Sequence, residues 1–211
     1  MSVSLNLNLS GTLPGFFLAA ENGTRGHALK QAIGGAVQRE VQDHLRRQDS
    51  SRPNQLGGVR THFYGDAAQA TFFAVANDGA TVTVAQQGFR QRVEGGTIRP
   101  VRTKWLAIPA RAEAYGKRPG EFSGQLDFVP VRADLALLVA RDGTRGTRLT
   151  TNAKGKRVRK TGNVEAGLVM YWLKKEVNQA PDPTLVPTEA RFKVVIAGAT
   201  ADWLNTIGAR P

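Results

Sequence analysis

The sequence predicts an α+β fold, in which a long N-terminal helix packs on a mostly antiparallel β-sheet and a second helix ends the chain. The first helix is indicated over residues 27–48, where apolar side chains recur at every fourth position. The members of that stripe are Leu29, Ile33, Val37, Val41 and Leu45. Apolar residues at three- and four-residue steps over 188–207 favour the C-terminal helix, with Thr188 as its cap. The β-branched segment 191–197 also suits a short strand.

Short alternating or β-branched segments between the two helices indicate the sheet. They are residues 2–9, 72–76, 80–85, 105–108, 126–131, 135–140 and 167–177, and the last of these also suits a helix. Asn77-Asp78-Gly79 joins two of them as a hairpin, because Asp-Gly is a strong signal for a tight turn. Residues 2–9 form either an ordinary first strand or an arm that adds a strand to a neighbour's sheet.

Two further features refine the expected fold. We expect a short second helix at 62–73 and a helix-like piece at 110–116. Inside the first helix, each glycine of the pair Gly34-Gly35 costs about 1 kcal/mol relative to alanine. The pair either permits a close approach by another part of the chain or is a weak point of the helix.

Composition limits the class of protein. The 211 residues suit a single domain over 1–211, and 41% apolar and 22% charged residues are typical of a globular chain. There are no cysteines, which excludes disulfides, thiol catalysis and thiolate metal sites. No segment approaches the ~18 apolar residues of a membrane span, so we expect no membrane association. The net charge of +12 favours a polyanionic partner, either nucleic acid or an acidic protein.

The basic charge is concentrated in one segment. Residues 143–163, expected as a long loop or hairpin tip, carry seven basic side chains and no acidic one. They are Arg145, Arg148, Lys154, Lys156, Arg157, Arg159 and Lys160. Such a run can neutralise several DNA phosphates without reading sequence, and it contains no aromatic residue to stack on a base. The alternative is a solvated loop that meets an acidic surface of a protein partner.

Catalytic and cofactor motifs are missing from the sequence. It has no GxSxG, GxxxxGK[ST] or GxGxxG motif, and no cofactor is predicted. His44 and Glu40 are spaced like metal ligands on a helix, but two ligands do not make a site. Acidic residues near the middle of the chain, such as Glu94, Glu113 and Glu121, lie among arginines and lysines, and surface ion pairs explain them most simply. We therefore expect a binding or assembly protein and not an enzyme.

Residues 88–122 resemble the virion-morphogenesis and tail-completion proteins of tailed bacteriophages and Mu-like prophages. The segments that carry this resemblance are Gly88-Phe89-Arg90-Gln91-Arg92, Gly95-Gly96-Thr97-Ile98-Arg99-Pro100, Trp105-Leu106-Ala107-Ile108-Pro109 and Ala112-Glu113-Ala114-Tyr115-Gly116-Lys117. The whole resemblance spans about residues 29–131, with weaker agreement near 170–177. The basic segment is not matched.

The resemblance implies a structural protein at the tail end or the head–tail junction of a virion, made in the bacterial host cytoplasm. It implies a homo-oligomeric ring, often of six subunits, around the DNA channel, in contact with tail-tube, terminator or head-connector proteins. Gly95, Gly96, Thr97, Ile98, Arg99 and Pro100 would then form a loop between strands that contacts a neighbour. The basic segment would face the channel and its DNA or the adjoining connector ring. A free DNA-binding protein that is not an enzyme remains the alternative.

Overall fold

The chain has an α+β fold, as predicted. The computed structural model describes residues 3–8, 24–52, 56, 61–77, 79–122 and 124–208. Two compact units divide the chain where the sequence predicted a single domain over 1–211, and each is described by itself. The first unit comprises residues 1–51, 62–95 and 180–211, and the second unit comprises 52–61 and 96–179.

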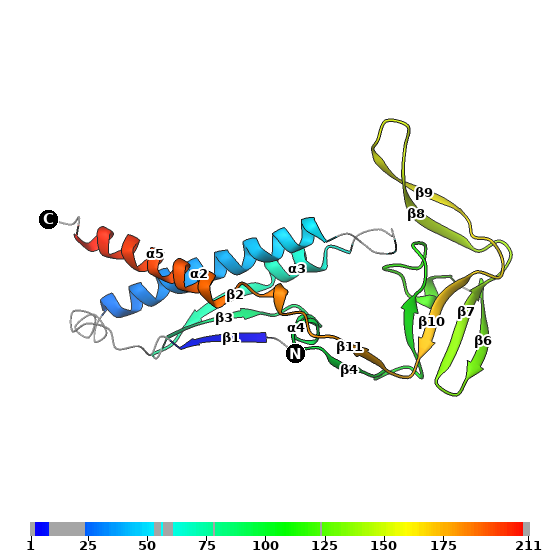
Figure 1. Cartoon of the computed structure of the whole chain (residues 1–211), viewed down its shortest axis with the longest axis horizontal. Coiled ribbons are helices and arrows are strands. Elements are labelled where there is room, and N and C mark those ends of the chain that lie inside the picture. The colour runs from blue at the N-terminus through cyan, green and yellow to red at the C-terminus, as the bar shows by residue number, and fades with distance from the viewer. Residues whose placement is uncertain are drawn as a thin grey trace. The chain divides into compact units, whose positions relative to one another are not determined.

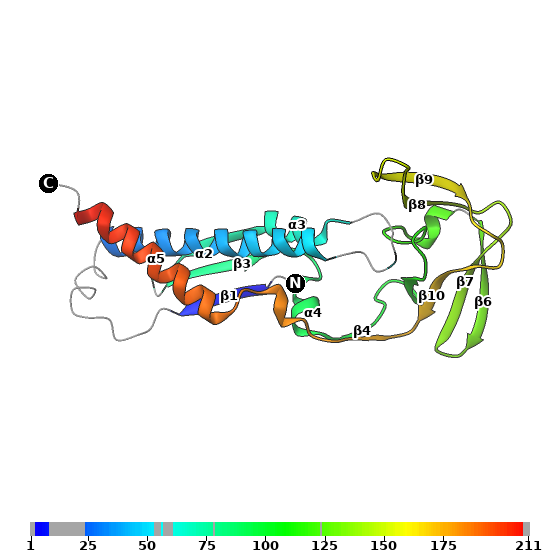
Figure 2. The same cartoon turned by 45° about the horizontal axis from the view of Figure 1, so that its top comes forward.

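The first unit contains helices on a three-stranded antiparallel sheet of order β1-β3-β2. Its elements are β1 (Val3–Asn8), α2 (Thr24–Ser51), α3 (Phe63–Gln69), β2 (Thr71–Val75), β3 (Gly79–Val84), α4 (Phe89–Glu94), the 3-10 helix η2 (Pro183–Leu185) and α5 (Glu189–Gly208). Figures 1 and 2 show that α2 runs along the sheet and that α5 crosses α2. Because β1 pairs with β3 of its own chain, the described part of the predicted segment, residues 3–8, is a first strand of this sheet and not an arm.

The predicted stripe of α2 is the centre of the first unit's core. Ile33, Val37, Val41 and Leu45 are buried, and Leu29 packs at the edge of the cluster. Val82 and Val84 of β3 meet this stripe, together with Phe192 of α5. Burying side chains of this size contributes about 1.5–3 kcal/mol each, so this stripe is the main source of stability in the unit.

The C-terminal segment is a helix and not a strand. The Thr188 hydroxyl accepts a hydrogen bond from the Arg191 amide at 3.3 Å, as expected of an N-cap. Phe192 is buried, and Val195, Ile196 and Ala199 pack on the core of the first unit at helical spacing. The alternative of a strand over 191–197 is therefore wrong, because the apolar residues reach the core only at helical spacing.

An ion cluster centred on the buried carboxylate of Glu40 joins α5 to α2. Glu40 is charged, yet its side chain is almost fully buried. Arg191 donates to its carboxylate at 2.7 Å, and Arg47 donates at 3.1 Å. The hydrogen bond from Arg191 is the largest cause that holds the pKa of Glu40 below its ordinary value of 4.5.

The glycine pair of α2 accommodates a side chain of the sheet. A Cβ at Gly34 would lie only 2.5 Å from Cδ2 of Phe73, whereas the nearest atom to a Cβ at Gly35 is 3.8 Å away. Gly34 therefore allows β2 and its phenyl ring to approach the helix, and only the first of the two glycines is required for this contact.

Several local predictions need correction. The helix expected at 62–73 ends at Gln69, because Thr71–Val75 pair with β3 as a strand. The piece at 110–116 forms consecutive turns with i→i+3 hydrogen bonds and not a helix. Helix α4 was not predicted. The hairpin over 72–85 is confirmed, although Asp78 in its turn lies outside the described residues.

The second unit is built from antiparallel strands. Its elements are β4 (Gly96–Ile98), β5 (Leu106–Pro109), the 3-10 helix η1 (Pro119–Phe122), β6 (Leu126–Arg132), β7 (Leu135–Ala140), β8 (Arg145–Thr151), β9 (Arg157–Asn163), β10 (Val169–Lys174) and β11 (Val177–Gln179). They form a four-stranded sheet of order β5-β10-β7-β6 and two ribbons, β11-β4 and β8-β9. The predicted strands at 105–108, 126–131, 135–140 and 167–177 are all present in the four-stranded sheet.

The two faces of the four-stranded sheet differ in their burial. Tyr171 of β10 is 0% exposed and stacks edge-on against Phe122 of η1, so the turns and η1 cover this face. Trp172, the next residue, points to the opposite face because side chains alternate along a strand, and it is 41% exposed. Its partners across the sheet are Ile108 and Leu137, and Leu137 in turn pairs with Val129. We call this row the open face.

Substitution of the two glycines separates close packing from helix propensity. Gly35→Ala should raise the free energy of unfolding by about 0.5–1 kcal/mol, because alanine favours a helix. Gly34→Ala should lower it by about 1–3 kcal/mol, because the Phe73 ring has to move. Urea denaturation of both variants measures the difference, and equal stabilisation by both would contradict the packing assigned to Gly34.

Glu40→Gln should lower the free energy of unfolding at pH 7 by about 1–3 kcal/mol, because two charge-assisted hydrogen bonds weaken. A carboxylate whose pKa is lowered on folding stabilises the protein above the unfolded pKa, and this stabilisation is lost as the pH falls below about 4.5. The difference between the variant and the wild type should therefore shrink below that pH. Asp43→Asn, which removes an exposed ion pair with Arg46, is the control and should have little effect.

Candidate nucleic-acid interface

The basic segment folds as a regular hairpin. β8 and β9 pair antiparallel from Arg145 opposite Asn163 to Thr151 opposite Arg157. At its tip, the side chain of Asn152 accepts hydrogen bonds from the amides of Lys154 and Lys156, and Gly155 adopts a positive φ of 73°. Of the loop or hairpin predicted over about 143–163, the structure contains a hairpin.

Thr144 anchors the hairpin to the rest of the second unit. It is fully buried, and its hydroxyl lies 2.7 Å from the carbonyl oxygen of Gln125 and 2.8 Å from that of Arg141. The amide of Val164 donates to the carbonyl of Thr144 at 2.7 Å and so fixes the other strand at the same level. All of β9 beyond this root is exposed, so the hairpin projects from a fixed base.

The register divides the basic residues between two faces. Arg148 lies directly opposite Lys160, in line with Gly146 opposite Gly162 on the same face. Arg145, Arg157 and Arg159 lie on the other face. In the part of the chain that the structure describes, none of the seven basic side chains takes part in an ion pair, so no described carboxylate neutralises them by direct contact.

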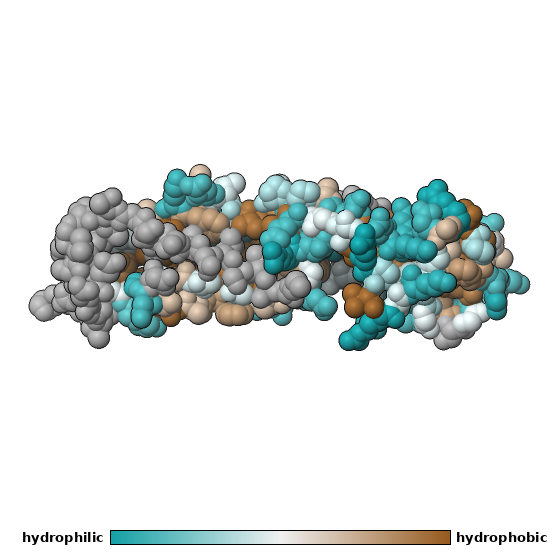
Figure 3. All heavy atoms as spheres, turned by 90° about the horizontal axis from the view of Figure 1, so that it is seen from below, coloured by the Kyte–Doolittle hydropathy of each residue, from teal (hydrophilic) through white to brown (hydrophobic). Residues whose placement is uncertain are grey.

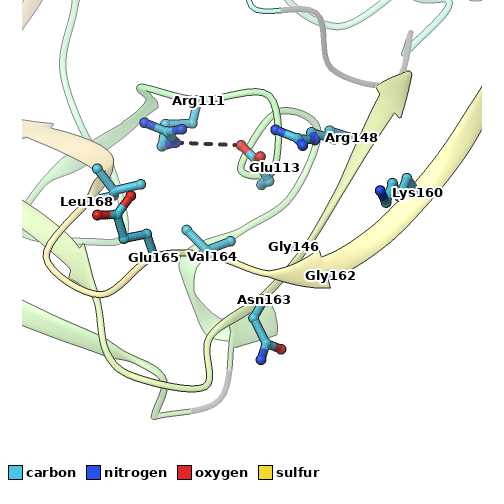
Figure 4. A pocket seen from close by; sticks show the side chains of 10 residues that line it. All are labelled: Arg111, Glu113, Gly146, Arg148, Lys160, Gly162, Asn163, Val164, Glu165 and Leu168. Carbon is cyan, nitrogen blue, oxygen red and sulfur yellow. Dashed lines mark ion pairs between the residues drawn. The ribbon is translucent and has the colours of Figure 1, made fainter. Parts of the chain in front are cut away.

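A cavity of about 380 Å³ lies on the first of these faces, at the root of the hairpin. Its ionisable residues are three bases and two acids, Arg111, Arg148, Lys160, Glu113 and Glu165. Figure 4 shows Arg111, Glu113 and Arg148 together at this cavity, while Asn163 points to the other side of the ribbon.

Glu113 and Gly146 close one side of the cavity. A Cβ at Gly146 would lie 2.6 Å from Cβ and Cγ of Glu113, so only glycine lets the turn pack against β8. Glu113 is 8% exposed, and Nε of Arg111 lies 3.6 Å from its carboxylate. This distance is too long for a hydrogen bond, and Nε of Arg111 is buried with no hydrogen-bond partner among the described residues.

The ion pair predicted for Glu113 therefore exists, but it is buried and long, and the expectation of a surface pair is corrected. Glu94 meets the expectation, since it pairs with Arg90 at 2.7 Å and both side chains are more than half exposed. Glu121 differs, because its carboxylate caps the backbone amide of Arg118 at 2.8 Å.

The second predicted contact segment, 95–100, is not a free loop. Gly96–Ile98 form β4, which pairs with β11 of the same chain, because both glycines adopt positive φ and turn the chain out of α4. The hydroxyl of Thr97 contacts the side-chain oxygen of Asn178 at 2.7 Å, and Arg99 pairs with Glu176 at 3.0 Å. No hydrogen bond or ion pair of the described residues joins this ribbon to the basic hairpin.

Two of the three histidines, His44 and His62, have structural partners. Nε2 of His44 lies 2.8 Å from the carbonyl oxygen of Thr184, while Glu40 is occupied by two arginines, so the two residues do not form a site together. Nδ1 of His62 lies 2.9 Å from the Asp49 carboxylate. In the described ranges, no group of three or more potential ligands could hold a metal ion.

Comparison with protein-family models, curated proteins and solved structures finds no match to this chain. Among the helices that the structure describes, none is both long and apolar enough to cross a membrane. The geometry of the chain's own residues is therefore the basis for the proposals below.

Arg111, Glu113 and the two hairpin glycines were not predicted to form a site. Arg111 and Glu113 lie more than 30 positions before the strands they meet, and no periodic pattern connects them. The sequence contained one signal that could have placed the glycines together. Gly146 and Gly162 are equally far from residue 154, so a hairpin centred there sets them opposite each other.

Tyr171 holds the turns beside the cavity in place, since its hydroxyl donates to the carbonyls of Ala114 at 3.2 Å and Lys117 at 3.0 Å. Burial, aided by the charge of Glu121, raises its pKa to about 12.

The contribution of the Tyr171 phenol to the free energy of unfolding is fully present below the unfolded pKa of 10 and should fall as the pH rises towards 12. Tyr171→Phe should cost about 1–2 kcal/mol at pH 7 and should reduce that alkaline loss. Urea denaturation between pH 7 and about pH 11 tests both effects, and an unchanged alkaline slope would contradict the assignment.

Proposed function

We propose that this chain is a structural protein of a tailed-phage particle, placed at the tail end or the head–tail junction, where it forms a ring around the DNA channel. The resemblance carried by residues 88–122 supports the proposal. In the structure, residues 88–95 contribute α4 to the first unit, and residues 96–122 contribute β4, β5 and the turns that cover one face of the four-stranded sheet in the second unit.

The observation that carries the proposal is the open face of that sheet. Ile108, Trp172 and Leu137 lie in one cross-strand row that extends to Val129, and none of the four is buried. Figure 3 shows hydrophobic residues, in brown, among hydrophilic ones on the surface of the molecule. A row of this kind is typical of an interaction surface, and a half-exposed tryptophan is the residue type most enriched in binding hot spots.

A neighbouring copy of the same chain is the partner that the proposal assigns to the open face. A chain with a charge of +12 repels its own copies, most strongly at low salt, so ring subunits need an apolar contact to hold them together. The ribbon that contains Gly95 to Pro100 would supply a second contact, with a tail-tube, terminator or head-connector protein. The virion is then the site of action.

A basic DNA-binding protein without enzymatic activity is the second candidate function. The observation in its favour is the β8–β9 hairpin, with seven basic side chains and no acidic one. This candidate requires no ring, and it expects a monomer or dimer whose attachment to DNA weakens steeply as salt rises.

Trp172→Lys tests the ring. Size-exclusion chromatography with light scattering should show a wild-type oligomer at low and at high salt, and a variant that is mainly monomeric, because loss of a central interface tryptophan weakens association more than about 30-fold. Val194→Lys, at an exposed position of α5 outside the open face, is the matched control and should leave the oligomer intact. Circular dichroism confirms that both variants are folded.

Two results would count against the ring. A wild-type protein that is monomeric at both salt concentrations contradicts self-assembly through the open face. A monomer that moves onto duplex DNA only at low salt supports the second candidate function.

A further inference from the structure

We propose that the cavity at the root of the β8–β9 hairpin binds a phosphate group of the duplex DNA backbone. The inference rests on the second candidate function, contact with DNA, and it is independent of whether the chain forms a ring. It assigns the contact to one face of the hairpin and to residues outside it.

The first argument is the juxtaposition of two like charges. Arg148 and Lys160 are directly opposite each other across the ladder, at a separation where like charges destabilise a sheet. No acidic side chain pairs with either of them in the described part of the chain. An anion held between them would remove the repulsion, and a phosphate oxygen is an acceptor that arginine and lysine both bind well.

The second argument is the space beneath these two residues. The next cross-strand pair on the same face is Gly146 opposite Gly162. The Glu113 side chain packs over Gly146, whereas the floor of the cavity at Gly162 is open. Gly162 does not adopt a positive φ, and a Cβ built on it would meet nothing within 4 Å. Its lack of a side chain is therefore not required by the backbone or by packing, and it keeps the cavity open.

Arg111 supplies a third cation from outside the hairpin. Its Nε is buried at the cavity without a hydrogen-bond partner in the described residues, and the carboxylate of Glu113 is 3.6 Å away. A buried, unsatisfied donor is costly. The Arg111 side chain as a whole is 38% exposed and lines the cavity, so its positive charge acts on an anion bound there. Glu113 sets the position of the turn against Gly146 and limits how deeply an anion can enter.

The hairpin as a whole suits a nucleic-acid backbone better than a single carboxylate. Seven residues per strand span about 24 Å at ~3.4 Å per residue. One DNA strand presents a phosphate for every ~3.4 Å of helix axis, which is about seven phosphates over the same length. The hairpin as a whole therefore has a positive charge density comparable to the negative charge density of a DNA strand, with Arg148 and Lys160 on the cavity face and Arg145, Arg157 and Arg159 on the other. An acidic protein would need a comparable row of carboxylates.

Two double variants of the full-length protein test the assignment with equal changes of charge. Arg148→Ala/Lys160→Ala removes the pair above the cavity, and Arg157→Ala/Arg159→Ala removes two charges from the opposite face of the same hairpin. Binding to a fluorescently labelled duplex is followed by anisotropy between about 50 and 200 mM salt. In both variants, the slope of log affinity against log salt concentration should become shallower by ~0.9 for each phosphate that is no longer neutralised. Arg148→Ala/Lys160→Ala should also bind about tenfold more weakly than Arg157→Ala/Arg159→Ala, because only the former loses hydrogen bonds to a bound phosphate.

Gly162→Val tests the cavity without changing charge. Valine is favoured in a strand, and its side chain would occupy the cavity floor. Affinity for the duplex should fall several-fold, while the salt dependence contributed by the remaining cations stays. Circular dichroism and thermal unfolding establish that each variant folds like the wild type.

Three results would overturn the proposal. Equal reductions in affinity for the two double variants mean that the hairpin acts only as a diffuse positive charge. Poly-L-glutamate of matched charge that competes as well as DNA, with the same dependence on Arg148 and Lys160, means that the cavity binds carboxylates. A wild-type protein that does not bind the duplex at the lowest salt removes DNA binding altogether, and only this result also rejects the second candidate function.

Discussion

Burial of one stripe of α2 is the constraint on which the first unit depends. A 28-residue helix is about 42 Å long and cannot hold its shape by propensity alone, particularly with two glycines in its interior. The stripe must therefore meet a surface of matching length, which β2, β3 and α5 provide. The Phe73 ring packs against α2 at Gly34, and Glu40 of α2 pairs with Arg191 of α5. Both contacts therefore fix α2 against its neighbours.

The second unit buries only one face of its four-stranded sheet. Turns and η1 cover that face, where Tyr171 packs with Phe122 and Ala114, and the other face is exposed to solvent. A sheet of this kind is stable with one buried face, so the open face can meet a partner without a change in fold. The hairpin is anchored only at its root by Thr144 and otherwise contributes little to the core. Both features are more easily understood as contact surfaces than as contributions to stability.

The two surfaces differ in the physics of the partner they favour. The row around Trp172 is apolar, and association through it would be weakly dependent on salt. The β8–β9 hairpin is cationic and exposed, so association through it would weaken as counterions compete. A ring subunit around a DNA channel uses both kinds of contact, and a free DNA-binding protein uses only the second.

The sequence by itself determined the elements whose signal is periodic and local. The fourfold spacing in α2, the Asp-Gly turn of β2 and β3, the cap at Thr188 and the run of basic residues all predicted what the structure contains. Tertiary structure decided the rest, because the responsible contacts join residues distant in the chain. Gln69 ends α3 since Thr71 and Phe73 pair with β3, and Gly96–Ile98 become a strand only through β11. The cavity arises in the same way, because Arg111 and Glu113 meet two glycines that only the register of the hairpin places opposite each other.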